Sequence, residues 1–285
     1  MELGSWELTE EFVHDYLRAV GDGLPLYSHH GMVPPVALAA RALGSLLERL
    51  ELPPGAIHSL QEVSALTPVA VGQVVTARAS VGQPKRRGDM EFITAAVCIS
   101  DKAGKDVLSS KTTVLVLDSP SLHSSKIRGS NAPPESDPGN TSQRTQAQSS
   151  PVNASKSLPV VARTITQDQL NAYAQVSGDR NPLHLDSQFA AATQFGGIIA
   201  HGMLTLAFIS EMMATEFQKS WLESGALRVR FKGAAYVGDS VETSGRVEKE
   251  ETQPGGSHLR CTVGVSGQNG QELVSGTATL LNRSS

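Results

Sequence analysis

"GMLTLAFISEMMATEF", residues 202–217, decides the fold, because this stretch is apolar on nearly every side. A helix of this kind has no polar face for solvent and is expected to be buried. Two runs of alternating apolar residues follow, and "GQNGQ" at 267–271 has the composition of a hairpin turn. The alternating residues are Leu227, Val229 and Phe231, then Leu259, Cys261, Val263 and Val265. The sequence therefore predicts an α+β unit in which an antiparallel sheet wraps a buried helix.

A shorter amphipathic helix is predicted before the buried one. Thr166 with Gln169 three residues later is a capping-box pattern, which marks the start of a helix. The residues that recur at helical spacing after it are Leu170, Tyr173, Ala174 and Ser177.

The same unit occurs twice along the chain. Four blocks of the first half recur in the second half in the same order. Residues 8–27 match 165–184 at an offset of 157 (165 − 8), and "HGM" at 30–32 matches 201–203 at an offset of 171 (201 − 30). Residues 68–81 match 234–247, and residues 99–115 match 265–281, both at an offset of 166 (234 − 68). Four blocks in one order indicate a duplicated ancestral unit.

Between the two copies the composition changes. Residues 119–158 are rich in Ser, Pro, Asn, Gln and Gly, and nearly their only large apolar residues are Leu122, Ile127 and Val152. Such a segment cannot bury enough apolar surface to offset the entropy of ordering. We expect an N-terminal unit at 1–118, a flexible linker at 119–158 and a C-terminal unit at 159–285.

The composition of the 285-residue chain excludes several functional classes. Its net charge of −4 and the absence of a basic patch argue against a nucleic-acid partner. The N-terminal residues do not resemble a signal peptide, no run is long and apolar enough for a membrane span, and the two cysteines are too few for a disulfide framework. We expect a cytoplasmic protein.

"SGDRNPLHLD", residues 177–186, is the strongest functional motif. Asp, Asn and Pro are also turn formers, so part of this run could serve the turn alone. Pro182, however, restricts its own backbone and that of Asn181, and the resulting rigid turn can hold Asp179 and His184 at a defined separation. An acid and a base on a rigid turn suit general acid–base chemistry.

Together with "AHGM" at 200–203, this motif resembles the signature of the MaoC-like, R-specific enoyl-CoA hydratases. The resemblance covers about 158–282 and implies two tandem hot-dog units, each a long helix wrapped by an antiparallel sheet. It also implies that Asp179 and His184 hold a water molecule as the acid/base pair, and that Asn181 orients the pair through its side-chain amide. The Gly202 N–H would donate to the thioester oxygen, although a glycine there could also serve only a tight turn into the helix. For His201 we expect a structural hydrogen bond.

The first copy of the motif reads "GDGLPLY", with Leu24 in place of the asparagine and Tyr27 in place of the histidine. Tyrosine titrates near pH 10, so the first site is predicted to be inactive. His184 and His201 are 17 positions apart (201 − 184), whereas Tyr27 and His30 are 3 apart (30 − 27). We interpret the difference as 14 missing residues that cover the site in the second unit. Their absence is expected to open space for a longer acyl chain beside the first unit's helix.

The sequence favours a hydro-lyase that hydrates 2-enoyl-CoA to (3R)-3-hydroxyacyl-CoA or catalyses the reverse dehydration. A dehydratase of acyl-carrier-protein thioesters and a non-catalytic thioester-binding hot dog remain alternatives. No metal-ligand spacing or dinucleotide fingerprint is present, so no cofactor or metal is expected. The partners expected are an acyl-CoA or acyl-carrier-protein thioester, without nucleic acid or membrane. Pairing of two such chains into a homodimer stays open.

Overall fold

The computed structural model describes residues 1–117 and 156–283. Most of the predicted linker at 119–158 lies outside the described residues. Its last three positions are described and belong to the second unit. Ser157 pairs with Arg246, and the Leu158 N–H donates to the Gly245 carbonyl, so the second unit starts no later than Lys156.

Among the described residues, the first unit contains six strands and the second contains five, and each unit has a set of helices. The first unit comprises β1 (Glu2–Glu7), α1 (Glu10–Val20), α2 (Leu26–His30), α3 (Pro35–Leu50), β2 (Ile57–Ala65), β3 (Val74–Val81), β4 (Lys85–Arg87), β5 (Met90–Asp101) and β6 (Asp106–Leu117). The second comprises β7 (Ala162–Thr164), α4 (Gln167–Ser177), the 3₁₀ turn η1 (Pro182–His184), α5 (Ser187–Ala191), α6 (Gly202–Ser224), β8 (Ala226–Phe231), β9 (Ser240–Gln253), β10 (Gly256–Gly267) and β11 (Glu272–Asn282).

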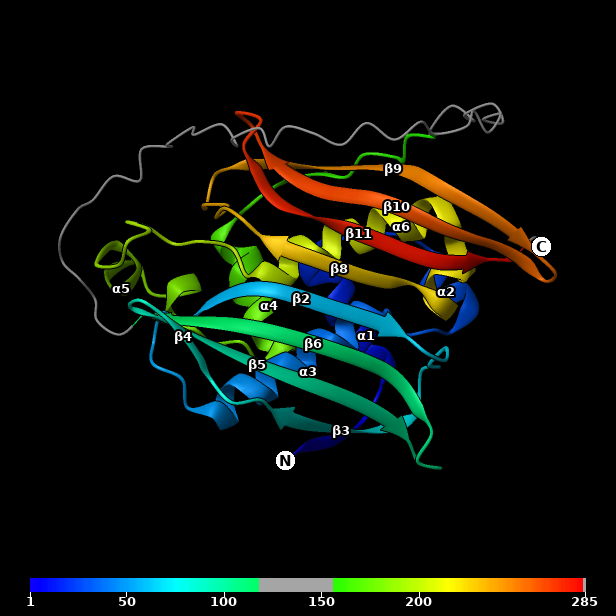
Figure 1. Cartoon of the computed structure of the whole chain (residues 1–285), viewed down its shortest axis with the longest axis horizontal. Coiled ribbons are helices and arrows are strands. Elements are labelled where there is room, and N and C mark those ends of the chain that lie inside the picture. Colours follow the sequence, from blue (N-terminus) through cyan, green and yellow to red (C-terminus); the bar gives the residue numbers. More distant parts are fainter. Residues whose placement is uncertain (118–155, 284–285) are drawn as a thin grey trace, which may run out of the picture.

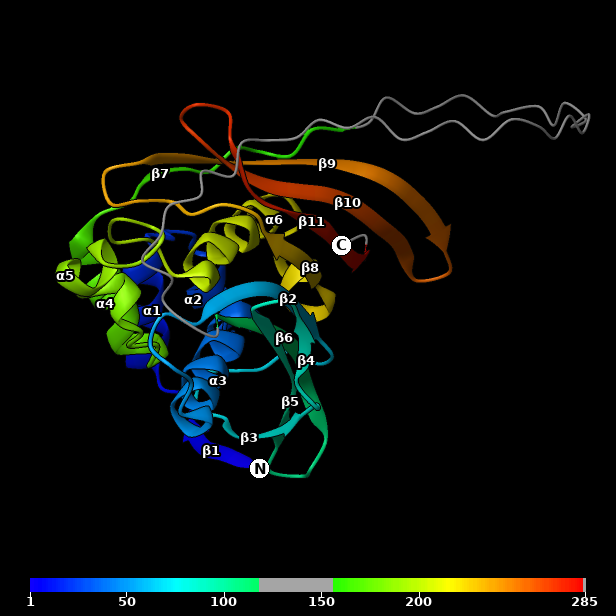
Figure 2. The same cartoon turned by 60° about the vertical axis from the view of Figure 1, so that its left-hand side comes forward.

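All strands join one antiparallel sheet, in the order β1-β3-β5-β6-β2-β8-β11-β10-β9-β7 with β4 on β5. The first half of this order maps onto the second half read backwards, so the two units are related by a pseudo-two-fold axis. The seam is the pairing of β2 with β8, where Glu62 lies opposite Arg228. The sheet curves around the helices, which lie together on its inner side (Figures 1 and 2). The expected α+β double hot-dog arrangement is confirmed.

The local predictions for the second unit are confirmed in detail. The Thr166 side chain accepts from the Gln169 N–H at 3.1 Å and caps α4, and the buried face of that helix is the predicted one. The apolar stretch forms α6 and is buried along most of its length. In the first unit Thr9 caps α1 in the same way, accepting from Phe12 N–H at 3.1 Å.

The alignment of the two "HGM" triplets is wrong. Gly31 ends α2 in a left-handed conformation (φ 57°), whereas Gly202 is the first residue of α6. The equivalent backbone bonds are Val33 N–H to Val69 O and Ala200 N–H to Ala235 O, which give an offset of 167 (200 − 33). Pro35 is therefore the counterpart of Gly202, and the second unit has 10 extra residues before this point (167 − 157), not 14.

No helix in the part of the chain that the structure describes is both long and apolar enough to span a membrane.

Candidate active site

The motif at 177–186 begins at the C-terminal end of α4. Gly178 ends the helix in a left-handed conformation (φ 79°), and the 3₁₀ turn η1 begins three residues after Asp179. The helix α3 approaches this point closely, because a Cβ on Gly44 would lie 2.1 Å from the Ser177 carbonyl oxygen. Any side chain at position 44 would push the turn that carries Asp179 away, so the first unit helps to position this turn.

His184 is buried, and its ring has a defined protonation state. Its Nδ1 lies 2.8 Å from the Ile199 carbonyl oxygen, which can only accept, so Nδ1 carries the hydrogen. The other nitrogen, Nε2, is then an unprotonated acceptor. Burial lowers the pKa of His184 below its ordinary value, although the Asp179 charge and the bond to Ile199 act in the opposite direction. The ring is therefore neutral near pH 7 and offers Nε2 as a base.

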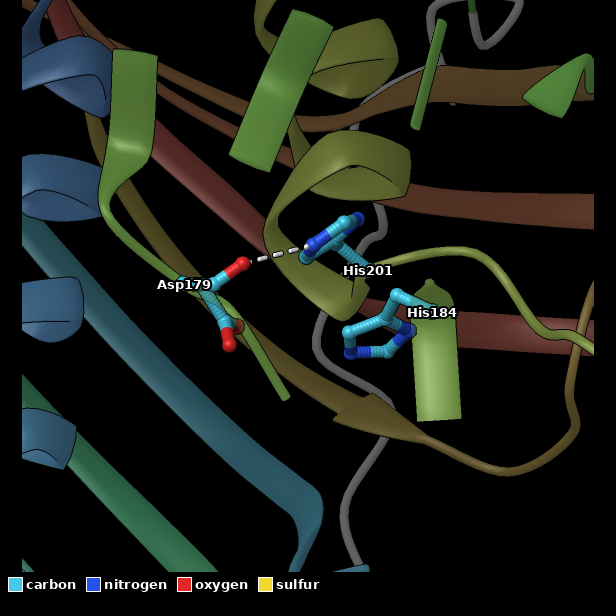
Figure 3. A group of neighbouring side chains, drawn as sticks. All are labelled: Asp179, His184 and His201. Atoms are coloured by element: carbon cyan, nitrogen blue, oxygen red, sulfur yellow. Dashed lines mark hydrogen bonds between the residues drawn. The ribbon is translucent and has the colours of Figure 1, made fainter. Parts of the chain in front are cut away.

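His201 contacts both Asp179 and His184. Its Nε2 donates to the Asp179 backbone carbonyl at 3.1 Å, and its ring stacks on His184 with 3.9 Å between centroids (Figure 3). The expected structural hydrogen bond is confirmed. Burial first, and the neighbouring His184 second, lower the pKa of His201 well below its ordinary value. Its second ring nitrogen, Nδ1, points away from Asp179 in Figure 3.

Asp179, His184 and His201 form a group that the sequence spacing did not reveal. Their potential ligand atoms all lie within 4.8 Å of one another. On His201 the nitrogen that faces Asp179 already donates a hydrogen bond, which makes it unavailable to a metal ion while that bond persists. Two hydrogen bonds of about 2.8 Å to one water molecule span about 4.5 Å, so the same group can hold a water.

Asn181 acts differently from what we expected. Its side-chain amide donates to the Ala56 carbonyl at 3.0 Å and accepts from the Leu183 N–H at 3.2 Å. Its contact with Asp179 comes from its backbone N–H, which donates to a carboxylate oxygen at 3.2 Å. Asn181 thus caps η1 and ties the turn to the first unit, and it orients Asp179 through the main chain.

Gly202 begins α6, which is interrupted by a kink at Gln218, and the first N–H groups of a helix have no partner inside it. Its N–H makes no hydrogen bond to any residue that the structure describes. A Cβ at this position would lie 3.1 Å from the Phe231 ring and 3.2 Å from His58 Nδ1. The helix dipole and the free donor favour a developing negative charge at this point.

A cavity of about 970 Å³ connects these groups. Its polar end contains Asp179, Asn181, His184 and Gly202, and its apolar side is formed by α3 and the segment after it. The large apolar residues of α3 and this segment that line the cavity are Leu43, Leu47, Leu52, Pro53 and Pro54, and Glu48 is a charged residue among them. Gln194 and Phe195, from the ten extra residues of the second unit, line the cavity as well. The site is therefore built from both units.

Comparisons with known proteins agree with this geometry. A model of the MaoC-like domain matches residues 149–269. A 3-hydroxybutyryl-CoA dehydratase of Methylorubrum extorquens is 30% identical over 118 residues, which cover 40% of this chain and 75% of that protein. The chain belongs to the MaoC-like hydratase/dehydratase family. An (R)-specific enoyl-CoA hydratase of Rhodospirillum rubrum is 29% identical over 121 residues, 42% of this chain and 82% of that protein.

The likeness to solved structures extends over both units. A Mycobacterium tuberculosis protein described as having a double hot-dog fold superposes with a TM-score of 0.66 at 12% identity, covering 98% of this chain and 93% of the other. The second unit carries the MaoC-like motif, and the first unit completes the double hot dog.

The corresponding region of the first unit is closed. Tyr27 donates its hydroxyl hydrogen to an Asp22 carboxylate oxygen at 2.7 Å, and burial raises the pKa of Asp22. Beside this pair, Arg163 donates to both Glu211 oxygens at 2.6 and 2.7 Å and to the Gly21 carbonyl at 2.8 Å. Burial and the Asp22 charge raise the pKa of Glu211 to about 7. Asp22 is thus bonded directly to Tyr27, and the Arg163–Glu211 pair lies beside it.

Proposed function

We propose that this chain catalyses R-specific hydration of a 2-enoyl-CoA to a (3R)-3-hydroxyacyl-CoA, or the reverse dehydration, at the Asp179/His184 site. The observation that carries the proposal is the neutral His184. The bond from Nδ1 to the Ile199 carbonyl leaves Nε2 unprotonated, and the polar side-chain atoms of Asp179 and His184 lie within 4.8 Å of each other, close enough for one water to bond to both, at the wall of a cavity large enough for an acyl thioester. The relatives named above act on the same class of thioester.

In this proposal the water between the two side chains is the nucleophile. His184 Nε2 takes one proton from the water as the oxygen adds to C3 of the substrate, while the Asp179 carboxylate accepts a hydrogen bond from the second hydrogen. The imidazolium then returns its proton to C2, so one water is consumed and the enzyme is unchanged. The Gly202 N–H and the N-terminus of α6 stabilise the negative charge on the thioester oxygen.

The apolar side of the cavity supports a substrate longer than a four-carbon chain. The residues from α3 and the segment after it give the acyl chain an apolar surface next to the first unit. We therefore expect medium-chain enoyl thioesters to be turned over at least as well as short ones.

Two basic residues, Arg180 and Lys232, line the cavity and could meet the phosphates of a carrier. Lys232 is already paired with Glu272 at 2.5 Å, so Arg180 is the freer of the two toward an anion. An acyl-carrier-protein thioester has the same reactive group, and a direct rate comparison separates the carriers. Cys98 and Cys261 are both free thiols, which fits the reducing cytoplasm where the proposal places the chain.

The test is the loss of enoyl absorbance when the protein is added to crotonyl-CoA and to a medium-chain 2-enoyl-CoA, with Asp179→Asn and His184→Ala alongside. We expect turnover by the wild type, an R-configured product, and losses of about 10²- to 10⁴-fold in each variant. A folded wild type that is inactive on both CoA substrates but active on the acyl-carrier-protein thioester would transfer the proposal to that carrier. Inactivity on all three would contradict it and favour a binding protein.

A further inference from the structure

A histidine of the first unit lies in the wall of the second unit's site. His58 is the second residue of β2, the strand at the seam, and it lines the same cavity as Asp179, His184 and Gly202. Its ring packs against Phe231, with 4.6 Å between ring centroids. Spacing along the chain could not predict this proximity, because 121 positions separate His58 from Asp179 (179 − 58).

The neighbours of His58 determine which ring nitrogen carries the hydrogen. Nε2 lies 2.9 Å from Gln61 Oε1 and 2.8 Å from Thr112 Oγ1. The Gln61 amide nitrogen donates to the Glu62 carbonyl and to Ser110 Oγ, so the amide oxygen is the atom that faces His58. That oxygen can only accept, and Nε2 therefore carries the hydrogen.

The other nitrogen, Nδ1, is then a lone-pair acceptor directed at the N-terminus of α6. It is the atom that a Cβ on Gly202 would approach to 3.2 Å. Burial lowers the pKa of His58 to about 4, so the ring is neutral near pH 7. Asp179 and His184 also act on this pKa, in opposite directions, because both lie near the ring.

The second unit shows that the fold itself does not need these polar side chains. Gln61 lies opposite Thr112 across β2 and β6, and both are buried at 1% and 3% exposure. The equivalent pair across β8 and β11 is Leu227 opposite Ala278, at an offset of 166 in both strands (227 − 61 and 278 − 112). Burying a polar pair is costly where an apolar pair suffices. The first unit, whose own site is closed, therefore retains a buried support for His58.

We propose that His58 is a positioning residue of the second unit's site: its Nδ1 accepts a hydrogen bond from a water molecule that donates its other hydrogen to the thioester oxygen beside the Gly202 N–H. His58 Nδ1 can only accept a hydrogen bond, so the water is needed to supply a donor. The thioester oxygen then has two donors, this water and the Gly202 N–H. This inference rests on the proposed function, and it makes the first unit a contributor to the chemistry.

The test compares His58→Leu, which keeps apolar bulk, with His58→Asn, which keeps a polar group near the place of Nδ1. We expect His58→Leu to lower kcat by about 10- to 100-fold with KM changed less than about threefold, since loss of a direct oxyanion donor costs about 10²- to 10³-fold. His58→Asn should retain most of the rate. Ser224→Ala, at the counterpart of His58 in the second unit (224 − 58 = 166), is the matched control and should leave the rate unchanged.

A second readout follows polarisation of the carbonyl directly. In a His184→Ala background, a cinnamoyl-CoA with an electron-donating ring substituent should show a red shift of its absorption on binding. Adding His58→Leu should reduce this shift, and adding His58→Asn should restore it. The double substitution Gln61→Leu with Thr112→Ala gives the first unit the equivalent residues of the second unit, Leu227 and Ala278. It should reduce the shift as well, because the His58 ring loses both hydrogen-bond partners of its Nε2.

The inference would be overturned by equal kcat values in wild type, His58→Leu and His58→Asn, together with equal spectral shifts in the His184→Ala background with and without these two changes. So would a loss confined to KM or to thermal stability. A wild type that does not hydrate enoyl-CoA would count against the proposed function alone, since the shift of the bound thioester still decides the role of His58.

Discussion

The two units place an aspartate at the same point of the same turn, yet only one of the two arrangements has the acceptor that the proposed activation of water requires. Asp179 faces a histidine across a gap within 4.8 Å, whereas Asp22 is bonded directly to Tyr27 at 2.7 Å. The unprotonated Nε2 of His184 is an acceptor, and two acceptors need a water between them. A tyrosine hydroxyl is a donor and closes the gap itself. The histidine of the second unit therefore leaves room for a bridging water, whereas the tyrosine of the first unit makes a direct contact.

A second difference lies at the start of the long helix. Gly202 offers a free N–H at the first position of α6, while Pro35 occupies the first position of α3 and has no N–H. The first unit thus lacks the backbone donor for a thioester oxygen as well as the base. The Arg163–Glu211 pair then fills the space beside Asp22. We therefore expect that Tyr27→His alone would not make the first site active.

The largest effect is expected from giving the second unit the proline of the first. Gly202→Pro removes the N–H at a helix position where proline is otherwise accepted, and we expect kcat for enoyl-CoA hydration to fall by about 10²- to 10³-fold. Gly202→Ala introduces crowding against Phe231 and His58 but keeps the N–H, so it should be the milder variant. Equal losses in the two variants would assign the effect to crowding.

The ion pair that fills the first site is expected to matter for stability and not for the chemistry. Arg163→Gln leaves the buried Glu211 without its partner and should lower the free energy of unfolding by about 2–3 kcal/mol at pH 8. The loss should be smaller at pH 6, because the pKa of Glu211 is about 7 in the folded protein and a neutral carboxyl needs no counter-charge. Denaturant unfolding at both pH values measures this.

The exposed pair Arg18–Asp15 supplies the control, since Arg18→Gln should not measurably change the free energy of unfolding at pH 6 or at pH 8. A loss for Arg163→Gln that is the same at pH 6 and pH 8 would contradict the account of Glu211.

The pH dependence of catalysis should report His184. The base must be neutral, and burial lowers the pKa of His184, so kcat/KM should rise with pH through an inflection below about 6.5, the value of a free histidine. Below that inflection the rate should fall by about tenfold for each pH unit. Tyr27→Phe, in the closed site, should leave the profile unchanged. An inflection above 6.5 would mean that the ring is stabilised as a cation.

The fold and the Asp179/His184 pair of the candidate site could be predicted from sequence, because both depend on local patterns. The capping box at Thr166, the buried face of α4 and the apolar α6 follow from spacing over a few turns. Asp179 and His184 are five positions apart on one rigid turn. Gly31 misled the alignment because identical letters at 30–32 and 201–203 end one helix in the first unit and begin another in the second.

His58, Gly44 and the true partner of the Asn181 amide could not be predicted, because each depends on how the two units meet. His58 reaches the site only because β2 pairs with β8. Gly44 matters only because α3 crosses the end of α4, and the Asn181 amide bonds to Ala56 in the other unit. Sequence spacing carries no information on such contacts between distant segments.

The most direct test of the central claim disables the two sites in turn and measures enoyl-CoA hydration in each protein. Asp179→Asn with His184→Tyr should abolish turnover, whereas Asp22→Asn with Tyr27→Phe should leave kcat unchanged in folded protein. Retention of activity in the first variant, or its loss in the second with the fold intact, would contradict the claim that the reaction takes place at the Asp179/His184 site and not at the Asp22/Tyr27 site.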